Sequence, residues 1–225
     1  MKKAQRIIIL SFCTSLILSA CSINTTSEKA ALDTLAVESE MTITPSNTQV
    51  SDFIAKNKDF MTYYETDECY NITPVFIAEN SEYEVFKYSE SGESFIMYDG
   101  KVYSIGRCIG GDGITSMALA DLDKNGEYEL YYTFSWGSGI HRSQVGYFEP
   151  ISKEIHIFKY ALVDYEMILT VNKSGDLCVN SAAFVDYDFD DCVNFTIKAQ
   201  DFNGTINYEN DRIELNIIAS LYTND

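Results

Sequence analysis

The residues with the clearest potential for chemistry are the oxygen-bearing side chains of the segment 121–129. They stand at positions 1, 3, 5 and 9 of this segment, and a glycine stands at position 6. Calcium prefers about six to eight oxygen ligands at short range, and a tight loop that turns back at a glycine can present alternate side chains to one ion. The spacing therefore predicts a calcium site. Its expected ligands are Asp121, Asp123, Asn125 and Glu129 through their side chains, and Glu127 through its backbone carbonyl.

This segment resembles the loops of FG-GAP and VCBS-type repeats, in which D-x-D-x-[DN]-G-x-x-[DE] joins two strands. The resemblance covers residues 111–139 and implies a calcium loop that stabilises a sheet corner and is not itself catalytic. An EF-hand is a poorer match, because its loop closes with glutamate at position 12, where this chain has Tyr132. The alternative to a metal site is a type I or I′ turn whose acidic side chains hydrogen-bond to the backbone.

A glycine-rich segment follows and holds Trp136, the only tryptophan, and His141, one of two histidines. We predict that Trp136, His141 and Arg142 line a ligand-binding loop beside the metal. One alternative is a hairpin with a packed tryptophan. The other is a catalytic site in which His141 activates Ser138 or Ser143, although the G-x-S-x-G sequence of a nucleophile elbow is absent here.

Two further features carry weaker signals. In the run 186–190 aspartates alternate with aromatic residues, so that on a strand Asp186, Asp188 and Asp190 would share one face. We expect a solvated outer face there, with a second ion site as the alternative. His156 lies in an apolar strand pattern and is expected to be structural.

The N-terminal residues have the features of an export signal. Basic residues precede an apolar run over residues 7–18, which is shorter than the roughly 20 residues of a membrane-spanning helix. Residues 18–21, with the sequence LSAC, resemble the lipobox of bacterial lipoproteins. The resemblance implies that residues 1–20 are removed and that Cys21 becomes a diacylated N-terminus. We therefore expect a protein anchored by lipid on Cys21 to the extracytoplasmic face of the cell membrane.

Composition limits the class of partner. Removal of residues 1–20 takes away three basic residues and no acid, and so changes the formal net charge from −18 to −21. Such a surface repels nucleic acid and suits cation binding. We expect an extracellular ligand or envelope protein as the partner. The apolar share of 46%, with 16 tyrosines and 13 phenylalanines, is enough for a folded core.

Four cysteines follow the lipobox: Cys69, Cys108, Cys178 and Cys192. None has the C-x-x-C spacing of a zinc or redox motif. An exported location permits disulfides, and the alternative is buried thiols. Cys178 with Cys192 is the local candidate pair, because the segment between them could form a hairpin.

The chain divides by composition into three parts: a signal peptide (1–20), a lipidated cysteine with a flexible linker (21–50), and a single β-rich domain (51–225). Ser51 and Asp52 are candidate caps of a short helix over residues 51–64. Asp-Gly at 99–100 is the favoured two-residue hairpin turn, and Ser-Gly at 174–175 and Asn-Gly at 203–204 also indicate turns.

The rest of the domain reads as short strands, rich in β-branched and aromatic residues and separated by turn residues. The expected strands are residues 74–78, 83–88, 94–98, 101–105, 115–120, 129–134, 143–148, 154–160, 167–171, 177–180, 193–199 and 212–220. This pattern predicts a mainly β fold, an antiparallel β-sandwich or barrel-like domain. A small propeller-like fold is the alternative, although no internal repeat supports it.

These features together predict a lipid-anchored cell-surface protein with a calcium-stabilised β domain, acting as a binding or accessory protein. A surface hydrolase acting on glycan, wall polymer or peptide is the alternative, and a purely structural envelope protein with a buried Trp136 is the third possibility. An enzyme would bring His141 within hydrogen-bond reach of a serine or a carboxylate inside a concave pocket. A binding module would show a shallow aromatic patch.

Overall fold

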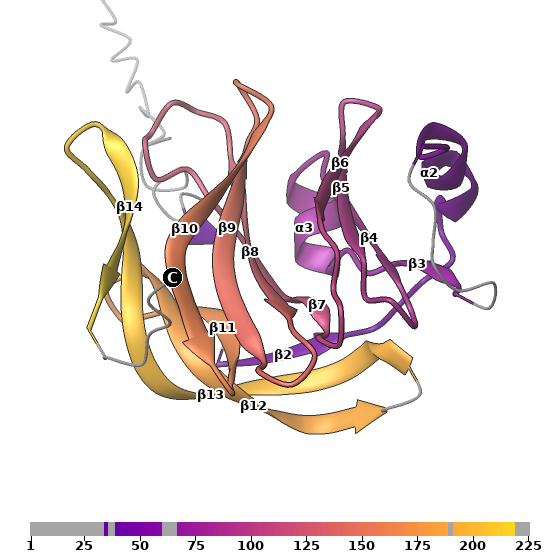
Figure 1. The fold of residues 1–225 in the computed structure, drawn as a ribbon. Helices are drawn as coiled ribbons and strands as arrows, with labels where there is room; N and C mark the ends of the chain where they lie inside the picture. The colour runs from indigo at the N-terminus through magenta and orange to yellow at the C-terminus, as the bar shows by residue number, and fades with distance from the viewer. Residues whose placement is uncertain (1–33, 36–38, 60–66, 189–190, 219–225) are drawn as a thin grey trace, which may run out of the picture.

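Strands dominate the computed structural model, which describes residues 34–35, 39–59, 67–188 and 191–218 (Figure 1). The lipobox and Cys21 lie outside the described residues, so the expected lipid anchor stays a prediction. No helix in the described part of the chain is long and apolar enough to cross a membrane.

The central sheet has the strand order β1-β7-β8-β9-β10, and all its pairings are antiparallel. Its strands are β1 (Thr34–Leu35), β7 (Gly113–Ala120), β8 (Glu129–Trp136), β9 (Arg142–Glu149) and β10 (Glu154–Val163). Every residue of β7 is buried, because both faces of this sheet are covered.

Two further antiparallel sheets cover the central one. The first has the order β11-β12-β13-β14, and β2 pairs with residues 195–198 of β13. Its strands are β2 (Glu40–Ile43), β11 (Glu166–Val171), β12 (Leu177–Asp188), β13 (Asp191–Glu209) and β14 (Arg212–Ile217). The second sheet comprises β3 (Cys69–Asn71), β4 (Glu84–Tyr88), β5 (Ser94–Tyr98) and β6 (Lys101–Gly106).

The apolar cores explain this layering. Successive side chains of a strand point to opposite faces. Met117 and Leu119 of β7 therefore enter a core shared with the β3–β6 sheet, while Ala118 and Ala120 enter a core shared with β11–β14. In Figure 1 the long β12–β13 ribbon runs below both other sheets. The mainly β class and the sandwich-like packing are confirmed, and none of the three sheets closes into a barrel.

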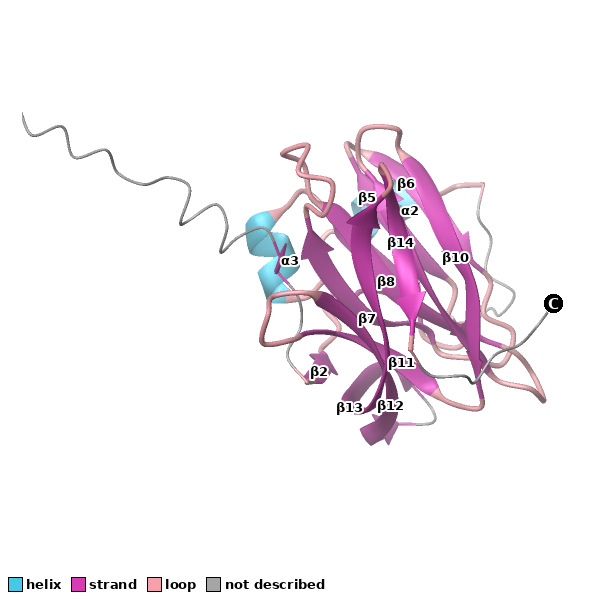
Figure 2. Cartoon of the chain, turned by 90° about the vertical axis from the view of Figure 1, so that its left-hand side faces the viewer, coloured by secondary structure: helices cyan, strands magenta, loops and turns pink. Residues whose placement is uncertain are grey.

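The linker prediction is wrong for part of residues 21–50. Residues 40–43 form β2, and its side chains Met41 and Ile43 are 3% and 1% exposed. Figure 2 shows β2 beside β13. Only two apolar residues alternate in this short strand, so its period-two pattern is too brief to stand out in a polar segment.

Both helices differ from the sequence-based expectations. The predicted helix 51–64 is α2 (Val50–Lys56) in the described residues, and Ser51 and Asp52 lie inside it without forming a side-chain cap. The predicted strand 74–78 is wrong, because this segment belongs to helix α3 (Val75–Asn80). Side chains at the end of this short helix bond to its carbonyls: Asn80 Nδ2 donates to Phe76 O and Ser81 Oγ to Ile77 O.

Turn predictions are confirmed at two of three places. Asp99 and Gly100 both have positive φ, as a two-residue hairpin turn requires, and Gly175 lies in the turn before β12. Asn-Gly at 203–204 lies instead within β13, at a register shift, where Asn203 Oδ1 accepts from Ser181 N–H. A bulge and a turn have the same sequence signature there.

The four cysteines are buried thiols, the alternative that the sequence left open, and the candidate pair Cys178 and Cys192 is not bonded. The predicted hairpin does form between β12 and β13. However, Cys178 pairs with Thr205, while Cys192 follows the β13 residue that pairs with Asp188. Ten residues of strand separate these two positions, which is about 33 Å and far beyond disulfide reach.

Candidate functional site

The predicted calcium segment forms the connection between β7 and β8. Asp121 follows the last residue of β7, and Glu129 is the first residue of β8. Lys124 and Gly126 have positive φ, at 59° and 98°, and so turn the chain back sharply. The segment therefore joins two paired strands, as expected, and its binding of calcium stays a prediction.

Hydrogen bonds hold this loop in shape. Asp123 Oδ1 accepts from Asn125 N–H at 3.0 Å, and Asn125 Oδ1 accepts from Glu127 N–H at 2.8 Å. Asp121 Oδ2 accepts from Gly126 N–H at 3.1 Å. Asn125 and Glu127 are exposed. Three of the five expected ligands come together: Asp121, Asp123 and Glu129 each place a carboxylate oxygen within 4.8 Å of the others.

Glu129 provides a test of whether this loop fits a cation. Its side chain is fully buried, and Oε2 accepts from Leu122 N–H and Tyr131 O–H. Oε1 is buried and has no hydrogen-bond partner. Burial raises the pKa of Glu129 to about 8. A buried carboxylate oxygen facing two other carboxylates is an arrangement that a calcium ion would stabilise, so the residues fit the ion.

The predicted ligand loop does not come together as one site. Trp136 and Arg142 form a cross-strand pair at the start of β9, and both line a small hollow of about 290 Å³. Trp136 is half-buried and stacks on Phe134, with ring centroids 6.3 Å apart. His141 lines a different and larger pocket. The structure therefore separates Trp136 and Arg142 from His141.

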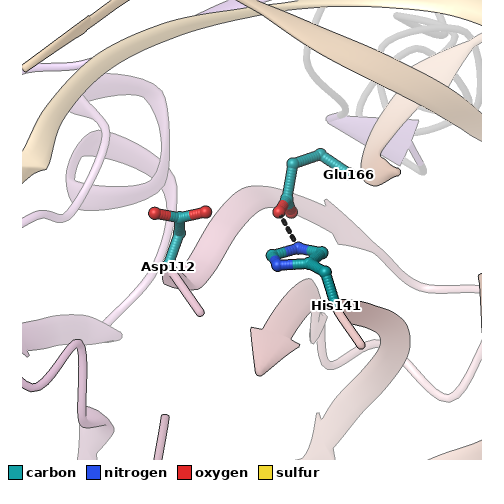
Figure 3. Close-up of side chains that lie close together, drawn as sticks. All are labelled: Asp112, His141 and Glu166. Carbon is teal, nitrogen blue, oxygen red and sulfur yellow. Dashed lines mark ion pairs between the residues drawn. The ribbon is translucent and has the colours of Figure 1, made fainter. Parts of the chain in front are cut away.

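His141 instead joins two carboxylates that the sequence did not single out, Asp112 and Glu166 (Figure 3). Each comes from a different element: Asp112 precedes β7, His141 precedes β9, and Glu166 begins β11. One ligand atom of each side chain lies within 4.8 Å of the other two.

Glycines fix the position of Asp112. A Cβ on Gly111 would lie 2.4 Å from Trp136 Cα, and a Cβ on Gly113 would lie 2.0 Å from Gly92 O. Gly113 also has a φ of 63°. Only glycine lets the backbone come this close to β8 on one side and to the turn that precedes β5 on the other. Asp112 is held between these two contacts. Asp112 N–H donates to Ser135 Oγ at 2.8 Å.

Backbone contacts bring His141 and Glu166 together. Asp164 N–H, in the turn between β10 and β11, donates to His141 O at 3.0 Å. The turn thereby places Glu166 against the imidazole, and Glu166 Oε1 contacts His141 Nε2. Thr115 Oγ1 donates to Glu166 Oε2 at 3.4 Å.

The pKa values of His141 and Glu166 are both raised, but from different causes. The hydrogen bond that His141 donates to Glu166 raises the pKa of His141, which favours the charged imidazolium. Burial raises the pKa of Glu166, although the contact with His141 opposes that shift. Asp112 is 9% exposed and Glu166 is 5% exposed. A proton or another cation is therefore required to balance two carboxylates with little access to water.

A pocket of about 790 Å³ opens beside these three side chains. Its other walls come from the β10–β11 turn and from β12, including Asp164, Tyr165 and Phe184. Its charged lining groups are carboxylates and His141, and none of the described lining residues is a lysine or an arginine. The pocket therefore suits a cationic occupant.

The second acidic run contributes to this pocket through an aromatic residue. Asp186 and Asp188 are exposed, as expected for a solvated face. Tyr187 lies between them, and its hydroxyl donates to Asp112 Oδ1 at 2.5 Å. Asp190 lies outside the described residues.

Local sequence gave two incomplete signals for this site. Asp112 stands among glycines at 110, 111 and 113, a pattern that indicates a tight backbone turn but no chemical role. Glu166 stands directly before an apolar run, and nothing in the sequence marks it as a site residue. The serine alternatives find no support: Ser143 is buried and its Oγ has no hydrogen-bond partner, and Ser138 is exposed. His156, as expected, is structural and stacks on Tyr147.

Comparison with known proteins gives no relative to guide assignment: no family model, no curated protein and no solved structure matches this chain.

Proposed function

We propose that this chain is an extracytoplasmic lipoprotein that binds a cationic ligand in the pocket beside Asp112, His141 and Glu166, with a calcium ion stabilising the loop 121–129. The observation that carries the binding role is the acidic lining of this pocket. A concave site with converging polar groups and perturbed titratable residues is the usual form of a ligand site.

The anchor rests on the LSAC sequence at residues 18–21. Growth of producing cells with radiolabelled palmitate tests it. Wild-type protein should carry the label and sediment with membranes, and Cys21→Ser should lose both properties. Labelled Cys21→Ser would refute acylation at this residue.

The calcium role rests on Asp121, Asp123 and Glu129, which would hold the ion. Calcium binds the folded state only, so at about one hundred times Kd it should stabilise the protein by about 2.7 kcal/mol. Thermal melting of the full chain with calcium or a chelator measures this effect. Asp121→Asn with Asp123→Asn should abolish it, while Asp176→Asn, in the exposed turn before β12, should preserve it. No calcium-dependent shift in the wild type would refute the site.

The cationic ligand can be tested with simple probes. Spermidine, lysine and divalent metals should be compared for their effect on melting of the full chain. At least one should stabilise the wild type, and Glu166→Gln should reduce that response because it removes a buried negative charge from the pocket. If none of these cations stabilises the wild type, the pocket is not a cation site.

A surface hydrolase is a second candidate, because His141 meets a carboxylate inside a concave pocket. Release of soluble fragments from purified wall polymer tests this function. Release by the wild type and not by His141→Gln would establish an enzyme. Equal release by both proteins, or none by either, would leave the binding role.

A further inference from the structure

We infer that Asp112, His141 and Glu166 form a second metal site, which binds Zn²⁺ or a first-row divalent ion with the same ligand preference. The inference rests on the proposed function, because it names the cation that the pocket takes. The site is separate from the loop 121–129, whose ligands lie on the β7–β8 connection.

The first argument is geometric. The three side chains stand far apart in the sequence, yet the β7, β9 and β11 strands bring one ligand atom of each within 4.8 Å of the others. Figure 3 shows the carboxyl groups of Asp112 and Glu166 approaching the His141 ring from two directions. One ion can contact all three after small side-chain movements, since a protein zinc site has ligand distances of about 2.0–2.2 Å.

The second argument is the balance of charge. Among the described residues, no lysine or arginine forms an ion pair with Asp112 or Glu166. The basic side chain that contacts Glu166 is His141. Two carboxylates buried to this degree need compensation. A divalent cation supplies two positive charges where the three side chains meet.

The donor set selects the class of metal. Calcium and magnesium prefer oxygen ligands throughout, whereas imidazole suits zinc, copper, iron and nickel. One histidine with two carboxylates is a mixed nitrogen and oxygen set. Three protein ligands beside an open pocket also match zinc sites that leave a coordination position for water or substrate.

Hydrogen bonds around the site support the same conclusion. Tyr187 O–H donates to Asp112 Oδ1, and Thr115 O–H donates to Glu166 Oε2. Such partners orient metal-binding carboxylates in known sites. A network in which the three groups only share a proton is the competing account.

Calorimetric titration of the chelator-treated full chain with Zn²⁺ tests the inference, and visible absorption of bound Co²⁺ reports an imidazole ligand independently. His141→Gln is the main variant. His156→Gln is the matched control, because it removes the other histidine, which stacks on Tyr147 away from the pocket. Asp121→Asn with Asp123→Asn is tested in parallel to exclude binding at the calcium loop.

We expect one tight Zn²⁺ per chain in the wild type and in both control proteins. His141→Gln, Asp112→Asn and Glu166→Gln should weaken binding by at least about tenfold, and Tyr187→Phe by about tenfold to a hundredfold. If His141→Gln does not fold, as judged by its circular dichroism, Asp112→Asn decides in its place.

Equal Zn²⁺ affinity in the wild type and the folded site variants would overturn the inference, as would the absence of stoichiometric binding in the wild type. Stabilisation by spermidine or lysine, lost in Glu166→Gln, without tight Zn²⁺ binding would overturn the metal site and leave the proposed function intact. Failure of both measurements would refute both proposals.

Discussion

At the scale of residues, the two clusters of possible metal ligands differ in whether their members lie close together in the sequence. Asp121, Asp123 and Glu129 are close in sequence, so a loop motif predicts them. Asp112, His141 and Glu166 meet only because three strands pair and pack, and no local spacing reports that. The sequence therefore identified all three members of the first cluster and only His141 of the second.

The buried carboxyl of Glu129 makes a pH-dependent prediction for the calcium-free protein. Its pKa rises from 4.5 to about 8 in the folded state, so the folded protein keeps a proton that the unfolded chain loses. This contribution to stability is fully present below about pH 4.5 and is lost as pH rises to about 8. Urea unfolding with a chelator should show this decline, and Glu129→Gln should reduce it.

Calcium provides the control for that experiment, because it stabilises the carboxylate form of Glu129. With saturating calcium the wild type should lose less stability between pH 5 and pH 8 than it loses with the chelator. The same pH profile in the wild type and in Glu129→Gln, both without calcium, would show that this carboxyl is not responsible.

At the scale of elements, strands were predictable where several apolar residues alternate or run together. β5 (Ser94–Tyr98) matches its predicted bounds, because its apolar run is buried and a hairpin turn ends it. β2 and α3 were missed for a common reason. Each has few buried residues, so contacts with the rest of the protein determine its conformation more than its own pattern does.

Gly113, the first residue of β7, also determines how the elements pack. In Gly113→Ala the new Cβ would lie 2.0 Å from Gly92 O, in addition to the strain of a positive φ. We expect a loss of about 3 kcal/mol or more in the free energy of unfolding. Urea unfolding measures this. Gly175→Ala is the matched control, with positive φ and no atom within 4 Å, and should cost about 1 kcal/mol. Equal losses would refute a close-approach role for Gly113.

At the scale of the whole molecule, the three sheets are joined by shared cores. The pocket is lined by the β6–β7, β8–β9 and β10–β11 connections and by β11, β12 and β13. The core that covers one face of β7 also includes Met41 and Ile43 from β2. The folded unit therefore begins before residue 51, and the predicted linker is shorter than composition suggested. The pocket and the calcium loop both depend on β7, which precedes the loop and follows Asp112.

Ile43 tests this enlarged boundary. Its side chain is 1% exposed on β2, where the strand pairs with β13, so Ile43→Ala should lower the free energy of unfolding by about 2–5 kcal/mol. A flexible linker residue would cost almost nothing. Urea unfolding of the full chain measures the difference, and Thr44→Ala, at the exposed neighbouring position, should stay within about 0.5 kcal/mol of the wild type. If Ile43→Ala is as stable as Thr44→Ala, β2 does not belong to the folded unit and the linker extends to residue 50.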